Sequence, residues 1–197
     1  MEMLKFLGIT EHRIIRGIIL AGTAYVPQGS PCGGAQMPSV QIFSHQLQTR
    51  INKQFVLGKR NRVILIKRSK KRQFIDMENI EEIVSNTAEA YGLVYTLFSD
   101  DPVPSLNSTM RMFAEAVMVV APHGAGLANL VFCQPKTVVV EVVCDNLCFL
   151  VLAHNLGHHY HAIPAVHGCP NFIDVDPKSI KSVMTSYIDV MIEMNYL

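Results

Sequence analysis

The stretch VMVVAPHGAGLANLVFCQPKTVVVEV, residues 117–142, holds the pattern that decides the fold. Its two β-branched runs, Val117–Ala121 and Thr137–Val142, are typical of buried strands. Between them, Pro122–Gly126 predicts a turn and Leu127–Phe132 predicts a short helix. A strand, a helix and a second strand in this order predict a parallel βαβ unit.

The same alternation continues on both sides of this unit. Three more short apolar runs are expected to be strands: Val63–Lys67, Leu93–Leu97 and His159–Ile163. The helices expected between and after them cover Met77–Tyr91 behind an Asp76 cap, a segment from Ser105 or Asn107 to about Ala116, a segment from Asp145 to Gly157, and a segment from Asp176–Pro177 to about Met194. Five repeats of strand and helix predict an α/β fold with a Rossmann-like, doubly wound parallel sheet.

The first 56 residues have a different pattern. Ile14–Leu20 and Gly22–Val26 are expected to be short strands, and Ser39–Phe55 a helix. This stretch is too small for a core of its own. We therefore expect residues 1–56 to be a partial interdomain remnant and residues 57–197 to be the domain that carries the site.

Composition excludes several classes of protein. The chain has 197 residues, of which 49% are hydrophobic and 17% charged, so it is not intrinsically disordered. No run of about 18 uncharged apolar residues predicts a membrane span, and the apolar start is too short for a signal peptide. The five cysteines are odd in number and loosely spaced, which suggests no disulfide framework and leaves the redox compartment undecided.

The cations are unevenly distributed along the chain. Residues 59–72 contain eight of the 17 Lys and Arg residues and no acid, whereas residues 73–197 contain 14 of the 16 acids. With a net charge of +1, the chain has no general attraction for nucleic acid or membrane. The pattern predicts a local anion site and argues against a nucleic-acid partner.

The first candidate site is the turn APHGAGLANL, residues 121–130. Gly124 and Gly126 allow a ligand to approach the backbone closely, and the start of the following helix favours an anion. His123 can donate a hydrogen bond to an oxygen, and Asn129 lies one turn further on. The alternative is a tight strand–helix turn with a structural histidine.

The second candidate is KRSKKR, residues 67–72, which follows the first strand. Its arginines, Arg68 and Arg72, suit bidentate phosphate contacts. Carboxyl ends of parallel strands share one edge of the sheet, so this loop is expected beside His123. Two anion-favouring elements at one edge predict a diphosphate between them; the alternative is a solvated basic loop.

Glu141 and the histidines complete the candidates. Glu141 interrupts a valine strand and could accept hydrogen bonds from ribose hydroxyls, or it could pair with Lys136 or water. His154, His158, His159 and His161 lie close in sequence, but Gly157 breaks the helix between them and no carboxylate or thiol completes a metal set. We expect these histidines to be core and surface residues, and we expect no metal site.

The motif APHGAGLANLVFCQPKTVVVEV resembles glycosyltransferase family 61. Three further segments resemble that family in the same order: VILIKRSKKRQFIDMENI, TMRMFAEAVMVVAPHGAG and AHNLGHHYHAIPA. The resemblance covers residues 57–190 well and residues 1–56 loosely. It implies a glycosyltransferase enzyme of GT-B architecture, of which this chain is the C-terminal, donor-binding half.

The resemblance also implies roles for particular residues. It makes Arg68 and Arg72 contacts to the diphosphate, and His123, Gly124, Ala125 and Gly126 the donor-phosphate turn. Leu127, Asn129 and Glu141 are candidates for the nucleoside or the sugar. The donor would be a UDP-sugar of the xylose or N-acetylglucosamine class, with no cofactor or metal.

The expected reaction is an inverting transfer of the sugar to a hydroxyl of a glycan or protein acceptor. The chain has no Trp, and residues 1–56 are too few for the acceptor-side domain, so a missing N-terminal half is expected to supply the general base. The alternative is a truncated, silent nucleotide-sugar-binding or structural remnant. A fragment of an anchored eukaryotic enzyme would lie in the ER or Golgi lumen, and otherwise the chain would be cytoplasmic.

Overall fold

The computed structural model describes residues 2–15, 17, 18, 20–23, 37–144, 146–167 and 171–197. Its centre is a parallel sheet of five strands in the order β3–β1–β4–β5–β6. These strands are β1 (Arg62–Lys67), β3 (Val94–Ser99), β4 (Ala116–Pro122), β5 (Val138–Val143) and β6 (His159–Pro164). The predicted strands are confirmed, with ends that shift by one or two residues.

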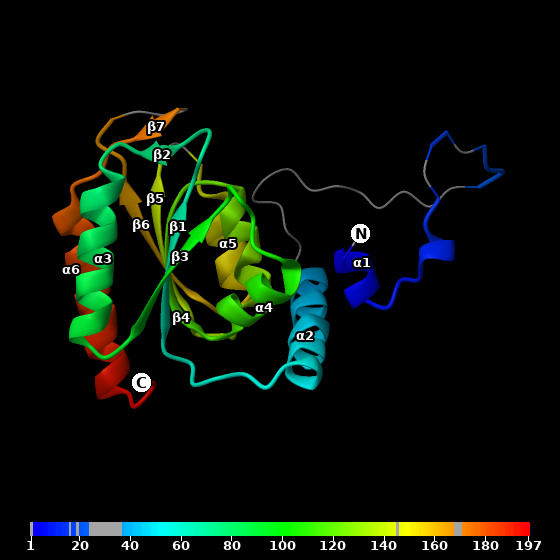
Figure 1. Cartoon of the computed structure of the whole chain (residues 1–197), viewed down its shortest axis with the longest axis horizontal. Helices are drawn as coiled ribbons and strands as arrows, with labels where there is room; N and C mark the ends of the chain where they lie inside the picture. The colour runs from blue at the N-terminus through cyan, green and yellow to red at the C-terminus, as the bar shows by residue number, and fades with distance from the viewer. Residues whose placement is uncertain (1, 16, 19, 24–36, 145, 168–170) are drawn as a thin grey trace.

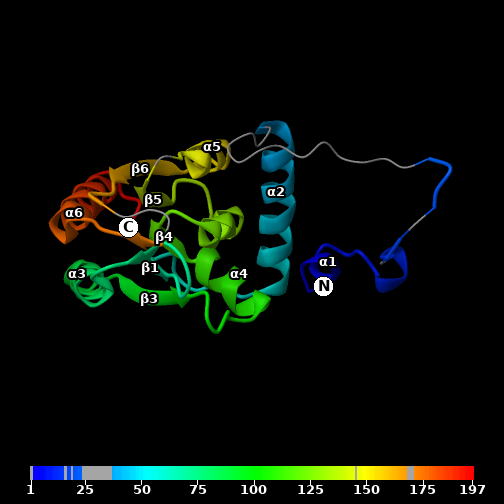
Figure 2. The ribbon, with the colours of Figure 1, turned by 90° about the horizontal axis from the view of Figure 1, so that it is seen from above.

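Helices cover both faces of this sheet (Figures 1 and 2). On one face lie α3 (Met77–Ala90) and α6 (Pro177–Glu193). On the other lie α2 (Met37–Gln54), α4 (Leu106–Ala114), α5 (Cys148–Asn155) and the 3₁₀ helix η2 (Ala125–Phe132). This three-layer arrangement is the expected Rossmann-like α/β fold.

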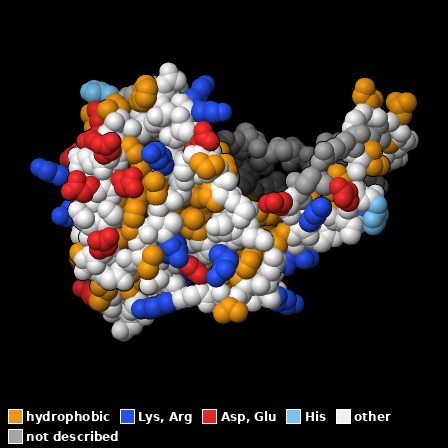
Figure 3. All heavy atoms as spheres, in the orientation of Figure 1, with side chains coloured by type: hydrophobic (Ala, Val, Ile, Leu, Met, Phe, Trp, Pro, Cys, Tyr) orange, Lys and Arg blue, Asp and Glu red, His pale blue; other side chains and the backbone are white. Residues whose placement is uncertain are grey.

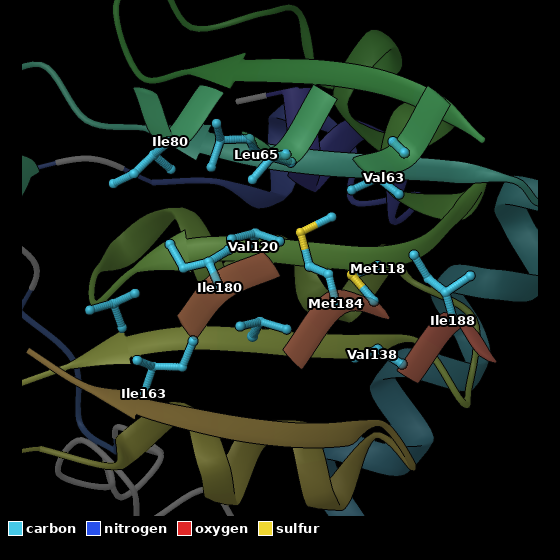
Figure 4. Packing of buried hydrophobic residues seen from close by; sticks show 14 of the residues in the cluster. Val63, Leu65, Ile80, Met118, Val120, Val138, Ile163, Ile180, Met184 and Ile188 are labelled. Atoms are coloured by element: carbon cyan, nitrogen blue, oxygen red, sulfur yellow. The ribbon is translucent and has the colours of Figure 1, made fainter. Parts of the chain in front are cut away.

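Two hydrophobic cores follow from the alternation of side chains along each strand. In β1, Val63 and Leu65 belong to the core under α3 and α6, whereas Ile64 and Ile66 belong to the core on the opposite face. Figure 4 shows the first core, in which Val63 and Leu65 lie with Met184 and Ile188 of α6. Both faces are covered, so the central strands β4 and β5 are buried at every position. The second core includes Leu47 and Ile51 of α2, which are fully buried.

The predicted helix caps are confirmed. Asp76 accepts a hydrogen bond from the Asn79 amide at 3.4 Å, and Ser105 accepts one from the Ser108 amide at 3.2 Å. Asp176 accepts from the Lys178 amide at 3.0 Å. These bonds satisfy N–H groups that the first helical turn leaves unpaired. The Asp145 cap lies outside the described residues.

The N-terminal prediction is partly wrong. The described residues among 14–23 form no strand, and Ile18 and Leu20 are almost fully exposed. Residues 24–26 of the strand expected at Gly22–Val26 lie outside the described residues. Before them come a short helix α1 (Glu2–Phe6) and a 3₁₀ turn η1 (Glu11–Arg13). The helix expected at Ser39–Phe55 is confirmed as α2.

Two features were not predicted. A small parallel sheet joins β2 (Gln73–Phe74) to β7 (Phe172–Ile173), and strands of two residues leave no periodicity to read. Cys144 and Cys148, which flank the β5–α5 loop, are disulfide-bonded. The sequence spacing did not indicate this because disulfides join residues that are close in space.

Candidate functional site

The site lies where the chain reverses direction in the sheet. After β1 the chain moves to β3 on one side and then crosses to β4 on the other, so β1 and β4 are neighbours whose following loops diverge. Doubly wound sheets with this strand order bind ligands at the carboxyl ends of the two strands flanking that point. The carboxyl edge lies at the top of Figure 1, beside β2 and β7.

The two predicted anion elements meet at this point. Arg68, the first residue after β1, lies directly against Gly124, the second residue after β4. A Cβ atom at Gly124 would come within 1.5 Å of the Arg68 Nη1 atom and 2.7 Å of its Cζ atom. Only a glycine leaves room for this guanidinium group, so the glycine has a steric role that the sequence alone did not show.

The guanidinium group of Arg68 is largely enclosed and short of partners. Its side chain is 15% exposed, and its Nε and Nη1 atoms have no hydrogen-bond partner within the described part of the chain. The nearest carboxylate oxygen, Oδ2 of Asp100, is 3.9 Å from Nε, which is too far for a hydrogen bond. Burial and the neighbouring charge of Arg72 lower the pKa of Arg68. The group is a confined cation without a close anion.

The loop that carries these cations is held by its own hydrogen bonds. The Ser69 amide donates to Asp100 Oδ1 at 2.7 Å, and the Gln73 side chain donates to the Ser69 carbonyl at 2.6 Å. Arg72 has a φ of +57°, a backbone conformation unusual for a residue with a side chain. Lys70 and Lys71 are exposed, and Figure 3 shows Lys and Arg side chains at this upper edge of the body.

The turn after β4 is built to be compact. Gly126 lies against β1, where an added Cβ would come within 2.9 Å of the Ile66 Cγ2 atom. The Asn129 side chain donates to the Gly126 carbonyl at 3.0 Å and so braces the turn. Ala125 is exposed, whereas Leu127 is fully buried in the core. The helix expected at Leu127–Phe132 is the 3₁₀ helix η2, which begins at Ala125.

His123 and Glu141 form a buried pair. The Nδ1 atom of His123 lies 2.5 Å from Oε1 of Glu141, and the hydroxyl of Tyr160 donates to the other carboxylate oxygen at 2.5 Å. Glu141 is fully buried, and burial raises its pKa, while the two hydrogen bonds and the charge of Arg72 oppose that effect. Glu141 is thus not an outward-facing residue paired with Lys136, because it is fully buried and both of its oxygens are bound by protein side chains.

The remaining predicted candidates lie apart. His158 is buried, while His154 and His159 are exposed. Among the described residues, no group of three His, Cys, Asp or Glu side chains is placed to hold a metal ion. Every helix in the described part of the chain is too short or too polar to cross a bilayer.

A hollow of about 560 Å³ lies at the opposite, amino edge of the sheet and competes as a candidate site. Its wall contains Arg62 and Glu115, which pair with each other at 3.0 Å, and Arg111, which lies over the Phe55 ring. Arg62 is paired with Glu115 there and has one buried nitrogen without a partner, whereas Arg68 has two such nitrogens and no carboxylate at bonding distance among the described residues. We therefore assign the candidate site to the carboxyl edge.

Sequence reasoning missed three residues of this site. Tyr160 holds Glu141, Asp100 holds the loop after β1, and the Phe149 ring packs edge-on against His123 with centroids 5.5 Å apart. Asp100 and Tyr160 belong to strands or loops far from the motif in sequence. A polar His-Tyr-His run at the start of β6 was the available signal for Tyr160.

Comparisons with known proteins identify the family of the chain. The model of the family described as "Glycosyltransferase 61" matches residues 9–140, a range that includes both anion elements. An 87-residue stretch is 36% identical to the beta-1,2-xylosyltransferase XYXT1 of Oryza sativa subsp. japonica, and it covers 44% of this chain and 17% of that relative. The matched part is therefore less than a fifth of the relative's length. The chain belongs to glycosyltransferase family 61.

Proposed function

We propose that this chain binds the diphosphate of a nucleotide sugar at the carboxyl ends of β1 and β4 and so forms the donor half of a glycosyltransferase. One observation carries the proposal: the Nε and Nη1 atoms of Arg68 are buried, lie in a side chain packed against Gly124, and have no partner among the described residues. An unpaired buried cation costs free energy that a bound anion would offset. A diphosphate supplies that anion in the fork geometry that arginine prefers.

The reaction we propose is a single displacement. An acceptor hydroxyl oxygen forms a bond to the anomeric carbon while the bond from that carbon to the β-phosphate oxygen breaks, and its electron pair leaves with the nucleoside diphosphate. Arg68, Arg72 and His123 would stabilise the charge that grows on the phosphate, and each lost donor of this kind costs about 3 kcal/mol of transition-state free energy. The acceptor proton goes to a general base, which we expect from the acceptor-side half of a GT-B enzyme.

The relative supports the donor class that we propose. Its name describes a xylosyltransferase, so we propose a UDP-sugar of the xylose class, with the N-acetylglucosamine class as the alternative. The acceptor would be a glycan or glycoprotein hydroxyl. Protein cations would neutralise the diphosphate without a metal ion.

We also propose that the protein acts in the ER or Golgi lumen. The support is the oxidised state of Cys144 and Cys148, because disulfides persist in oxidising compartments and are rare in the cytosol. Mass spectrometry of the protein from its native source, alkylated without reduction, tests this. Free thiols at both positions would contradict the proposal.

Calorimetry with UDP tests the proposed function. The wild-type chain should bind UDP, and Arg68→Ala should weaken that binding about 10- to 100-fold, because it removes hydrogen bonds to a charged group. Arg111→Ala is the matched control, since Arg111 is an exposed arginine at the opposite edge. Absence of wild-type binding at millimolar UDP would favour a structural remnant. Comparison of UDP-xylose with UDP-N-acetylglucosamine then tests the sugar class.

A further inference from the structure

Tyr160 is connected to the candidate site through the carboxylate of Glu141, which also bonds His123. It lies on the edge strand β6, and its hydroxyl donates to Oε2 of Glu141 at 2.5 Å. Glu141, on β5, receives His123 on its other oxygen, also at 2.5 Å. Tyr160 and Glu141 lie on adjacent parallel strands and His123 directly follows the next strand, β4, so the three side chains form a continuous line from the sheet edge to the candidate diphosphate site.

The carboxylate in the middle of this line has a fixed orientation. Glu141 is fully buried, and each of its oxygens has one short hydrogen bond from a different strand. The charged or titratable groups that act on it are His123 after β4, Tyr160 on β6 and Arg72 after β1. Rotation of the carboxylate would break both hydrogen bonds at once, so the two donors hold it in place together.

The fixed Glu141 carboxylate also determines how the His123 ring is oriented. A carboxylate bound to Nδ1 determines which ring nitrogen carries the proton and how the ring is oriented. Within the described part of the chain, Nε2 of His123 has no protein partner. The ring therefore offers Nε2, and not Nδ1, to a ligand.

We propose that Tyr160 is a positioning residue for nucleotide-diphosphate binding: by locking the Glu141 carboxylate, it holds His123 with Nδ1 donating to Glu141, so that Nε2 of the doubly protonated ring can donate to a phosphate oxygen. This inference rests on the proposed function and adds to it a residue that does not itself contact the donor. Tyr160 acts through Glu141, and Glu141 acts through His123.

The test compares Tyr160→Phe with a matched control. Tyr91→Phe removes a hydroxyl that also donates to a carboxylate, Asp189 at 2.9 Å, but on the α3–α6 face away from the site. Two readouts are taken on the full chain: nitrogen-15 NMR of the His123 ring, identified by its loss in His123→Gln, and the affinity for UDP between pH 6 and pH 8.

In the wild type and in Tyr91→Phe, we expect one His123 ring form in which Nδ1 donates to Glu141, and with UDP bound we expect a second ring proton on Nε2, donated to a phosphate oxygen. In Tyr160→Phe we expect two exchanging tautomers and roughly tenfold weaker UDP binding. The loss should grow as pH falls, because Glu141 without its tyrosine donor takes up a proton more readily and releases Nδ1. Glu141→Gln should give the larger loss with little pH dependence.

The two readouts separate the possible failures. If the wild type does not bind UDP but Tyr160→Phe still changes the His123 tautomer, the proposed function is wrong and the positioning chain stands. If Tyr160→Phe keeps the single tautomer and binds UDP within twofold of wild type, Tyr160 is only structural and the inference is overturned. An affinity loss equal to that of Tyr91→Phe would also overturn it.

Discussion

Strand β1 carries arginines near both of its ends, and the two ends differ in how those arginines are satisfied. At the amino end, Arg60 donates to the Ala116 carbonyl and to Thr137, both at 3.0 Å. Arg62 bonds Thr96 and pairs with Glu115 at 3.0 Å, with only its Nε lacking a partner. At the carboxyl end, Arg68 has neither a hydrogen bond from Nε or Nη1 nor a carboxylate within 3.5 Å among the described residues.

This difference separates two uses of the same residue type. The amino-edge arginines join strands to one another and are part of what holds the sheet together. The carboxyl-edge arginine is buried at a cost to the fold, which is typical of a group kept for binding. The run of cations at residues 59–72 therefore divides between a structural edge and a binding edge. The following predictions test that division, beginning with the largest expected effect.

The largest expected effect is a loss of stability in acid, because the amino edge of the sheet contains a buried neutral histidine. His158 donates from Nε2 to the Leu130 carbonyl at 3.2 Å, and burial, together with the Arg60 charge, lowers its pKa to about 4. The unfolded chain binds this proton at about pH 6.5, so stability contributed by neutral His158 is complete above pH 6.5 and is lost as the pH falls towards 4. We expect a loss of about 3 kcal/mol over that interval.

Urea unfolding of the wild type and of His158→Gln between pH 7.5 and pH 4 measures this effect. The difference between the two curves isolates His158 from Glu141, whose raised pKa contributes with the opposite sign. A difference that stays constant with pH would show that His158 does not stay neutral in the folded chain.

The same substitution to Met should have opposite effects at Arg62 and at Arg68: it should lower stability at the first and UDP affinity at the second. Arg62→Met leaves Glu115 without its partner and should cost about 2 kcal/mol of unfolding free energy, with UDP affinity unchanged. Arg68→Met should keep or raise stability and abolish most UDP binding. Urea unfolding and calorimetry on both variants check this. Equal destabilisation by the two variants would remove the distinction between the edges.

The strands and the edge of the sheet that carries the candidate site could be predicted from the sequence. Runs such as Val63–Lys67 gave correct strands because a two-sided core demands β-branched residues, and parallel strands end at one edge. The same argument predicted that Arg68 and His123 share that edge. The order of strands was not determined by it, so the contact of Arg68 with Gly124 and the line from Tyr160 to His123 could not be foreseen.

Substitution of the two glycines in the turn after β4 by alanine should affect stability and UDP affinity differently. Gly126→Ala places a Cβ against Ile66, a stiff and buried side chain, and should cost about 1–2 kcal/mol of stability. Gly124→Ala meets the guanidinium group of Arg68 and adds a side chain at a φ of +159°, so it should lower UDP affinity as well as stability, whereas Gly126→Ala should leave UDP affinity largely unchanged. Thermal unfolding and calorimetry distinguish the two. Wild-type UDP affinity in Gly124→Ala would contradict the role given to the Arg68 position.

The smallest effect is expected at Asp100, the weak anion beside Arg68. Asp100→Asn keeps an oxygen for the Ser69 amide, which now donates at 2.7 Å, and removes the charge that lies 3.9 Å from Arg68. A partly exposed pair at this distance contributes well under 1 kcal/mol, so UDP should bind about threefold more tightly once the competing charge is gone. Calorimetry at low salt measures the change, and added salt should reduce it. Weaker binding by Asp100→Asn would mean that Asp100 supports Arg68 in its binding position, and the carboxyl-edge arginine would then have a structural partner as its amino-edge counterparts do.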